Sequence, residues 1–134
     1  MTEKPRPQLT GIVLDAPDPR GLAAFYRELL DWKVDMDEPT WVKLSPPGGG
    51  YGLAFQLEPN YARPTWPTEV GRPGMMAHLD IEVDDLETAG ARAVALGAEL
   101  AGFQPQQDVR VYLDPVGHPF CLWVRTGPAT SPGP

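Results

Sequence analysis

The chain has 134 residues, of which 42% are hydrophobic and 22% charged, and its formal net charge is −7. This length suits one domain with a substantial core, and the acidic balance disfavours nucleic acid or an anionic membrane surface as a partner. No apolar run approaches a membrane span, the N-terminus lacks a signal-peptide pattern, and the single cysteine, Cys121, leaves no internal disulfide. These features predict a cytoplasmic protein with no membrane and no nucleic-acid partner.

The first half of the chain predicts the order strand, helix and three strands. Asp18 is placed as the N-cap of a helix and Pro19 as its first residue, after which apolar side chains recur at helical spacing. Alternating apolar residues before and after that helix indicate strands separated by turn clusters. The expected elements are a helix at residues 19–30 and strands at residues 9–16, 32–37, 41–45 and 52–57.

The second half repeats that order, starting from the segment at residues 75–97. Its strand alternates so that His78, Asp80 and Glu82 are predicted on the face turned away from the following helix. Asp84 occupies an N-cap position in a capping-box pattern, and a glycine closes the helix. Three short strands are expected near residues 99–103, 109–114 and 119–125.

The two halves match at a constant offset, which indicates an internal duplication. The separation between Gly11 and His78, in the first strand of each half, equals the separation between Asp18 and Asp85, where each helix starts. We therefore predict an α+β fold of two βαβββ modules whose helices cover one sheet face, while the other face is solvated, paired with the other half or wrapped around a ligand. The predicted organisation is a disordered tail at residues 1–8, module one at 9–58, a connecting loop at 59–74, module two at 75–126 and a disordered tail at 127–134.

Four stretches of sequence carry a family resemblance: FYRELLDW at residues 25–32, HLDIEVDDL at 78–86, LGA at 96–98 and DPVGHPFCL at 114–122. Together they resemble the vicinal oxygen chelate superfamily, which includes glyoxalase I, bleomycin-resistance proteins and extradiol dioxygenases, and within it the glyoxalase-like branch. The resemblance implies a single glyoxalase-like domain at residues 9–126, in which a curved eight-stranded sheet forms a cup with the helices outside. It also implies a homodimer. Because this fold hosts lyases, oxygenases, epimerases and binding proteins, it does not by itself assign a function.

The same resemblance places the family's four metal-ligand positions at Gly11, Gln56, His78 and Cys121. Members that use a metal usually carry histidine or glutamate there, and only His78 keeps that type. Glycine offers no side chain, a glutamine amide is a weak donor, and zinc held by one histidine and one cysteine lacks a third strong ligand. We therefore expect no cofactor, and a divalent metal is disfavoured.

The predicted cup wall combines aromatic and polar side chains. On the last two strands, residues 109, 111 and 113 and residues 120, 122 and 124 are assigned to the core, which leaves Arg110, Tyr112 and Trp123 on the other face. A ligand cup would explain these exposed aromatic residues, and a dimer interface would explain them nearly as well. The candidate ligand-binding residues are Trp41, Gln56, Trp66, His78, Asp80, Arg110, Tyr112, Cys121 and Trp123.

The candidates also have plain structural interpretations. His78 is the best catalytic candidate, as a metal ligand or as a general base beside Asp80, or else it is a hydrogen-bonded histidine of the wall. Cys121 has no basic neighbour in sequence, which favours a buried, inert thiol, and His118 is expected as an exposed turn residue. Trp66 belongs to a proline-rich loop that either covers the cup mouth or acts as a rigid connector.

The sequence therefore favours a glyoxalase-like small-molecule-binding protein that works without a metal and holds a planar or carboxylate-bearing ligand in the cup. Aromatic side chains supply contact area, and Arg110 supplies one fixed positive charge for a carboxylate. The alternative is a lyase or dioxygenase-type enzyme that uses His78 as a metal ligand or general base, so whether the chain is an enzyme stays open.

Overall fold

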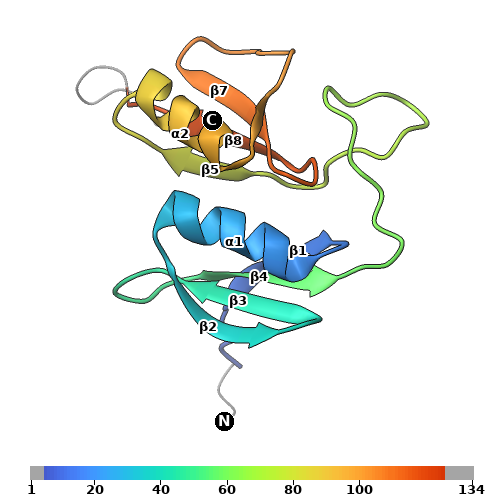
Figure 1. The fold of residues 1–134 in the computed structure, drawn as a ribbon, viewed down its shortest axis with the longest axis vertical. Coiled ribbons are helices and arrows are strands. Elements are labelled where there is room, and N and C mark those ends of the chain that lie inside the picture. Colours follow the sequence, from blue (N-terminus) through green and yellow to red (C-terminus); the bar gives the residue numbers. More distant parts are fainter. Residues whose placement is uncertain (1–4, 126–134) are drawn as a thin grey trace. The chain divides into compact units, whose positions relative to one another are not determined.

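A computed structural model describes residues 5–125, and the chain divides into two compact units, Met1–Pro59 and Asn60–Pro134 (Figure 1). Residues 1–4 and 126–134 lie outside the described part, and with them most of the two tails that the sequence predicts to be disordered. Within residues 5–125, no helix is long and apolar enough to cross a membrane.

The first unit is a four-stranded sheet with one helix packed on it. Asp18 is the N-cap of that helix and Pro19 its first residue, as predicted, although the Asp18 side chain makes no capping hydrogen bond. The sheet order is β1-β4-β3-β2, with β1 and β4 parallel and the other pairs antiparallel. The elements are β1 Gly11–Ala16, α1 Pro19–Leu30, β2 Lys33–Glu38, β3 Trp41–Ser45 and β4 Gly52–Leu57.

The second unit repeats this architecture. Its sheet order is β5-β8-β7-β6, with β5 and β8 parallel. The elements are β5 Leu79–Glu82, α2 Leu86–Leu96, β6 Glu99–Leu100, β7 Val109–Leu113 and β8 Pro119–Trp123. The eight strands therefore form two four-stranded sheets, and the predicted α+β fold of two βαβββ modules is confirmed.

The strand register reproduces the offset seen in the sequence. Ile12 pairs with Leu53 in the first unit, and Leu79 pairs with Phe120 in the second. The separation from Ile12 to Leu79 and that from Leu53 to Phe120 both equal the separation from Gly11 to His78. Since the pairing continues along both parallel ladders, each residue on β5 or β8 has a defined counterpart on β1 or β4. This correspondence allows the two units to be compared position by position.

Helix α2 begins one residue later than the capping-box pattern indicates. The N-cap is Asp85 rather than Asp84, and its carboxylate accepts hydrogen bonds from the Thr88 backbone N–H at 2.8 Å and the Thr88 hydroxyl at 2.6 Å. These hydrogen bonds lower the pKa of Asp85. Gly97 ends the helix with a φ of 124°, a conformation that disfavours residues with a Cβ.

Each helix covers one face of its own sheet. In the first unit Tyr26 of α1 stacks on Phe55 of β4 with ring centroids 5.7 Å apart. In the second unit Tyr112 of β7 stacks on Phe120 of β8 at 5.9 Å, and a Cβ on Gly90 of α2 would overlap the Tyr112 hydroxyl. The opposite face of each sheet is therefore the one that carries any candidate site.

Candidate functional site

The second sheet places a row of polar side chains on the face turned away from α2. His78, Asp80 and Glu82 are exposed while Leu79 and Ile81 between them are partly buried, so the predicted alternation is confirmed. In the parallel β5–β8 ladder Asp80 pairs with Cys121 and Glu82 with Trp123, which puts Cys121 and Trp123 on the same face. We call this surface the His78 face; it consists of His78, Asp80, Glu82, Val109, Val111, Leu113, Cys121 and Trp123.

Three of these side chains bring potential ligand atoms together. His78 Nε2 lies 3.0 Å from Asp80 Oδ1, and the imidazole nitrogen, the carboxylate oxygen and the Cys121 sulfur all lie within 4.8 Å of one another. We call His78, Asp80 and Cys121 the donor cluster. The side chains of His78 and Asp80 are 32% and 30% exposed, whereas Cys121 is buried. The cluster is thus open to solvent on its imidazole and carboxylate side.

The Cys121 thiol is protonated at neutral pH. Burial, the negative charge of Asp80 and a hydrogen bond with Asp80 raise the pKa of Cys121 to about 11. The thiol therefore acts as a hydrogen-bond donor to the carboxylate rather than as a thiolate nucleophile. This geometry agrees with the expectation of a buried, inert thiol.

An apolar wall surrounds the sulfur atom. Cys121 is packed with Ala101, Val109 and Val111, and two tryptophans from the candidate set, Trp66 and Trp123, pack against this group. Trp66 belongs to the loop before β5, and its indole Nε1 donates to the Phe103 carbonyl oxygen at 3.1 Å. The second unit therefore brings five of the predicted site residues, His78, Asp80, Cys121, Trp66 and Trp123, into one region.

The loop that carries Trp66 is tied to the β7–β8 turn of its own unit. The Tyr61 hydroxyl donates to the Val116 carbonyl oxygen at 2.9 Å, and the Arg63 side chain packs so closely on Gly117 that a Cβ there would collide with it. Arg63 also lies 3.8 Å from the Glu99 carboxylate. These contacts hold the loop, and with it Trp66, in place within the second unit.

That turn contains a carboxylate–imidazole pair that the sequence analysis did not foresee. Asp114 is 2% exposed, and it accepts hydrogen bonds from the backbone N–H groups of Val116 and His118, each at 3.0 Å. Its second oxygen lies 2.8 Å from His118 Nδ1, and the His118 side chain is only 16% exposed. The expectation of an exposed turn histidine is therefore wrong, and the four-residue spacing of Asp114 and His118 around the turn was the available signal.

Two predicted wall residues, Arg110 and Tyr112, lie on the opposite face. In the register Arg110 pairs with Leu122 and Tyr112 with Phe120, on the face covered by α2, so their predicted place beside His78 is wrong. Tyr112 is 6% exposed, and burial raises its pKa. The assignment failed because β7 is largely buried on both faces, so alternation alone did not indicate which side faces the helix.

Arg110 is also engaged in a structural role. Its Nη1 donates to the backbone carbonyls of Gln107 at 2.6 Å and Val109 at 2.9 Å, which fastens the segment before β7. The cation beside the His78 face is instead Arg125, whose guanidinium lies 5.6 Å from the Trp123 ring centroid and 3.6 Å from the Glu82 carboxylate. Arg125 is thus the residue that can offer a positive charge to a ligand on this face.

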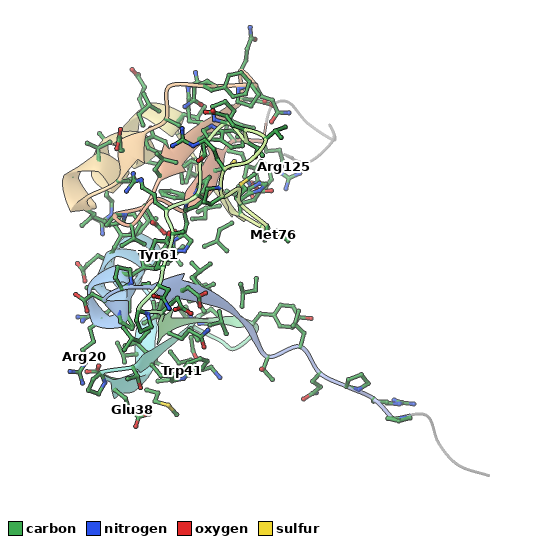
Figure 2. All side chains as sticks on the ribbon, turned by 90° about the vertical axis from the view of Figure 1, so that its right-hand side faces the viewer. Arg20, Glu38, Trp41, Tyr61, Met76 and Arg125 are labelled. Atoms are coloured by element: carbon green, nitrogen blue, oxygen red, sulfur yellow. The ribbon has the colours of Figure 1, made fainter. Side chains whose placement is uncertain are left out.

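The remaining two candidates, Trp41 and Gln56, belong to the first unit and pair with each other in the β3–β4 ladder. Gln56 Nε2 donates to Asp15 Oδ1 at 2.8 Å. Trp41 is partly buried and pairs on its other side with Glu38, near which it is seen in Figure 2. Within the first unit these side chains form a polar surface with an indole, but no group of three metal-ligating atoms is found there among the described residues.

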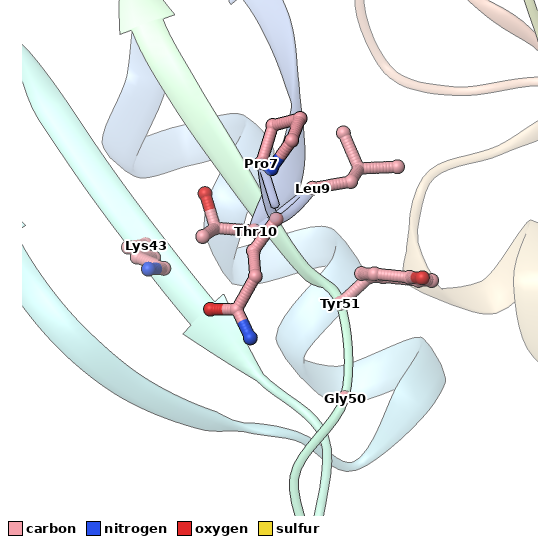
Figure 3. A pocket seen from close by; sticks show the side chains of 7 residues that line it. Pro7, Leu9, Thr10, Lys43, Gly50 and Tyr51 are labelled. Carbon is pink, nitrogen blue, oxygen red and sulfur yellow. The ribbon is translucent and has the colours of Figure 1, made fainter. Parts of the chain in front are cut away.

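The first unit also contains a hollow of about 550 Å³ between its N-terminal segment and β3 (Figure 3). Its lining includes one cation, Lys43, and one aromatic ring, Tyr51. The residues that line it are Pro7, Gln8, Leu9, Thr10, Lys43, Gly50 and Tyr51. None of them is a predicted site residue, and the hollow offers no pair of groups suited to acid–base chemistry.

Because the register is known, the donor cluster can be compared with its counterparts in the first unit. The positions that correspond to His78, Asp80 and Cys121 hold Gly11, Val13 and Ala54, none of which carries a ligand atom. The sequence-based prediction of metal ligands did not include Asp80, because Asp80 is not one of the four ligand positions that the family resemblance implies. An imidazole, a carboxylate and a thiol are all zinc ligands, and three protein ligands with an open position are the usual number in a catalytic zinc site. The donor set of the second unit therefore fits a metal of that class.

The family model for the glyoxalase-like domain matches residues 11–123, so the chain belongs to this family. No curated protein matches the chain. Similar solved structures include a glyoxalase/bleomycin resistance protein/dioxygenase family enzyme from Burkholderia phytofirmans, with 18% identity, a TM-score of 0.67 and coverage of 88% of this chain and 98% of that one.

Two further solved structures have more specific names. A lactoylglutathione lyase from Agrobacterium tumefaciens has 18% identity and a TM-score of 0.58, with 90% of this chain and 96% of that chain covered. A fosfomycin resistance protein from Listeria monocytogenes, solved with Mn(II) and a dihydroxypropylphosphonic acid, has 15% identity and a TM-score of 0.62, with 87% and 88% covered. At these identities the likeness establishes the fold alone.

Proposed function

We propose that this glyoxalase-like protein binds a small planar or carboxylate-bearing molecule on the His78 face. The single observation that carries the proposal is the convergence of polar and aromatic groups there. His78 and Asp80 offer a hydrogen-bonding pair, and Trp66 and Trp123 offer flat apolar contact. A few convergent polar groups in an apolar surround are the usual composition of a small-molecule site.

Arg125 takes the role in carboxylate binding that the sequence analysis gave to Arg110. Its guanidinium already lies near Trp123 and Glu82, at the edge of the His78 face. A guanidinium binds a carboxylate through two parallel hydrogen bonds, and an acidic ligand would compete with Glu82 for it. In this candidate function the protein's own side chains hold the ligand and no metal takes part.

A second candidate function is that of a lyase or dioxygenase-type enzyme in which His78 is a metal ligand or a general base. The observation that favours it is the donor cluster, because three ligand atoms of different type converge within 4.8 Å. His78, Asp80 and Cys121 would hold the metal, which supplies Lewis-acid polarisation of a bound oxygen when it is present. The wall around Cys121 would limit the access of water to the sulfur.

We also propose that the chain forms a homodimer. Its support is the unequal protection of the two edges of the first sheet. Both edge strands have two exposed apolar residues, but β1 carries a single charged residue, Asp15, whereas β2 carries four, which protect that edge from pairing. Light scattering at micromolar concentration should give about twice 14.6 kDa, and a mass near 14.6 kDa would contradict the dimer.

The binding proposal is tested by thermal-shift screening of planar aromatic compounds and small carboxylic acids. A ligand that binds only the folded protein raises Tm by mass action. Trp123→Ala and Arg125→Gln should abolish the shift, whereas Arg110→Gln should leave the relative affinities within the series unchanged. If Arg125→Gln and Trp123→Ala both keep the full shift, the ligand does not lie on the His78 face. Conversion of a bound compound to a new product, lost in His78→Ala, would establish the second candidate function.

A further inference from the structure

We propose that the donor cluster is a zinc-class cation site that the second unit forms by itself, with His78 Nε2, Asp80 and Cys121 Sγ as its three protein ligands. This inference rests on the second candidate function, since it specifies which metal such an enzyme would take. It departs from the arrangement implied by the family resemblance, in which both modules contribute ligands. Asp80 is the ligand that is not among the four positions implied by the family resemblance.

The geometry suits a small tetrahedral ion. Zinc bonds of about 2.0 to 2.3 Å require ligand atoms about 3.3 to 3.8 Å apart. In the cluster the His78 and Asp80 atoms are 3.0 Å apart, and all three atoms lie within 4.8 Å of one another. Rotation that moves the partly exposed imidazole and carboxylate by about 1 Å would therefore complete the three-ligand set around the fixed sulfur, without a change in the strands.

The donor types select the class of metal. Magnesium and calcium bind oxygen ligands almost exclusively, and the cluster offers only one carboxylate. An imidazole and a sulfur ligand suit zinc, and the preference extends to cobalt as its spectroscopic substitute. Zinc binds sulfur as the thiolate, so the ion would displace the Cys121 proton to solvent, and the thiolate and the Asp80 carboxylate would together balance the charge of a divalent cation.

The backbone and packing fix the relative positions of the ligands. Asp80 and Cys121 are directly paired residues of the parallel β5–β8 ladder, so their side chains leave adjacent strands on the same face. Cys121 is held by Ala101, Val109 and Val111, which leaves its sulfur little freedom to turn away. Only His78 lies outside the strand, and its Nε2 already lies 3.0 Å from Asp80 Oδ1, so the imidazole and the carboxylate meet where the ion would bind.

The first unit contributes no ligand to this site at the corresponding positions. Their occupants, Gly11, Val13 and Ala54, have no side-chain donor. Asp15 is the counterpart of Glu82, and its carboxylate accepts a hydrogen bond from Gln56. Asp15 and Glu82 therefore provide two matched controls: one acidic side chain in the other unit, and one on the same face but outside the cluster.

The test measures binding of Zn(II) and Co(II) to the full-length chain, purified without metal-affinity resin and treated with chelator. Calorimetry should show one Zn(II) per chain, and Co(II) should produce a near-ultraviolet absorption band that arises from a sulfur–cobalt bond. His78→Gln, Asp80→Asn and Cys121→Ser should each weaken binding at least tenfold, and Cys121→Ser should also remove the band. Asp15→Asn and Glu82→Gln should bind as the parent chain does.

Two results would overturn the inference. One is the absence of stoichiometric Zn(II) binding by the folded parent chain. The other is binding that survives in both Asp80→Asn and Cys121→Ser, with circular dichroism verifying that each variant is folded and Cys121→Ala replacing Cys121→Ser if it is not. If zinc fails to bind while a carboxylic acid still raises Tm in the chelator-treated protein, the zinc site is refuted and the binding function stands.

Discussion

In both units a tyrosine packs between the helix and the sheet. In the first unit this tyrosine lies on the helix, whereas in the second unit it lies on a strand. Tyr26 of α1 stacks on Phe55, and Tyr112 of β7 stacks on Phe120, at nearly equal centroid distances of 5.7 and 5.9 Å. The counterpart of Tyr26 in the second unit is Ala93, which is fully buried. The large side chain therefore comes from the helix in one unit and from a strand in the other, and the space between helix and sheet is filled in both.

The corresponding sheet and helix positions of the two units also differ in the size of their side chains. Tyr112 pairs with Phe120 as Leu44 pairs with Leu53, so the sheet position holds a leucine in one unit and a tyrosine in the other. On the helix, Ala23 of the first unit corresponds to Gly90 of the second, where a Cβ would overlap the Tyr112 hydroxyl. Two copies of one module therefore keep the packed volume between layers rather than the source of each side chain.

The other sheet face differs in another way: both units carry polar side chains there, but three potential metal-ligand atoms converge in the second unit. The donor cluster of the second unit corresponds to glycine, valine and alanine in the first. Packing constrains the buried face of both copies, whereas the exposed face is free to diverge, and it is there that the units acquire different chemistry.

The largest expected effect comes from removing the helix-borne tyrosine. Tyr26→Ala should lower the free energy of unfolding by about 3–5 kcal/mol, because it empties the space of a fully buried ring. Urea unfolding followed by tryptophan fluorescence measures it, with the 63% exposed Tyr51 replaced by alanine as the control. A decrease in the free energy of unfolding below about 1 kcal/mol would mean that the Tyr26 ring contributes little to the packing between α1 and the sheet.

The pH dependence of the Cys121 thiol distinguishes the two units next, since the counterpart Ala54 cannot titrate. Its pKa is raised from 9.0 to about 11, so the native state binds the proton more tightly than the unfolded state. This stabilisation is fully present below pH 9 and is lost as the pH rises through 11. Alkylation of native Cys121 should therefore rise about tenfold per pH unit between pH 8 and 10, and a rate that is flat over this range would contradict the raised pKa.

A change at the buried helix–sheet contact, with a smaller effect, tests whether Gly90 makes room for Tyr112. Gly90→Ala should destabilise the protein by about 1–3 kcal/mol despite alanine's higher helix propensity, because the added Cβ meets the Tyr112 hydroxyl. Tyr112→Phe removes the hydroxyl and should restore most of the loss in the double variant, which a double-mutant cycle of urea unfolding measures. Additive losses would show that the two residues do not meet.

The smallest effect concerns the two helix N-caps. Asp85→Ala should lower Tm by a few degrees at neutral pH, whereas Asp18→Ala should lower it less, because only Asp85 makes a side-chain capping hydrogen bond. The pKa of Asp85 is lowered in the native state, so its contribution is present above its ordinary pKa and is lost as the pH falls below it. Equal losses in scanning calorimetry at pH 7 would remove this difference between the helices.

Some features of the site were readable from local pattern and others were not. The alternation that placed His78 and Asp80 on one face was correct, because β5 has one polar and one apolar face. The same reasoning failed on β7, where Arg110 and Tyr112 face the helix although their apolar neighbours suggested the reverse. A period of two defines two faces but does not say which one the helix covers when both are largely buried, as in β7.

The sequence by itself determined the duplicated βαβββ order, the helix boundaries to within one residue and the family, because these depend on spacing, capping and turn residues that act locally. Only the tertiary structure decided that Asp80 and Cys121 are neighbours, since a parallel ladder joins residues that lie far apart in the chain. It also decided that Arg125 rather than Arg110 is the cation beside the His78 face. The direction of a side chain follows from strand register and from which face the helix covers, and both are set by packing between elements.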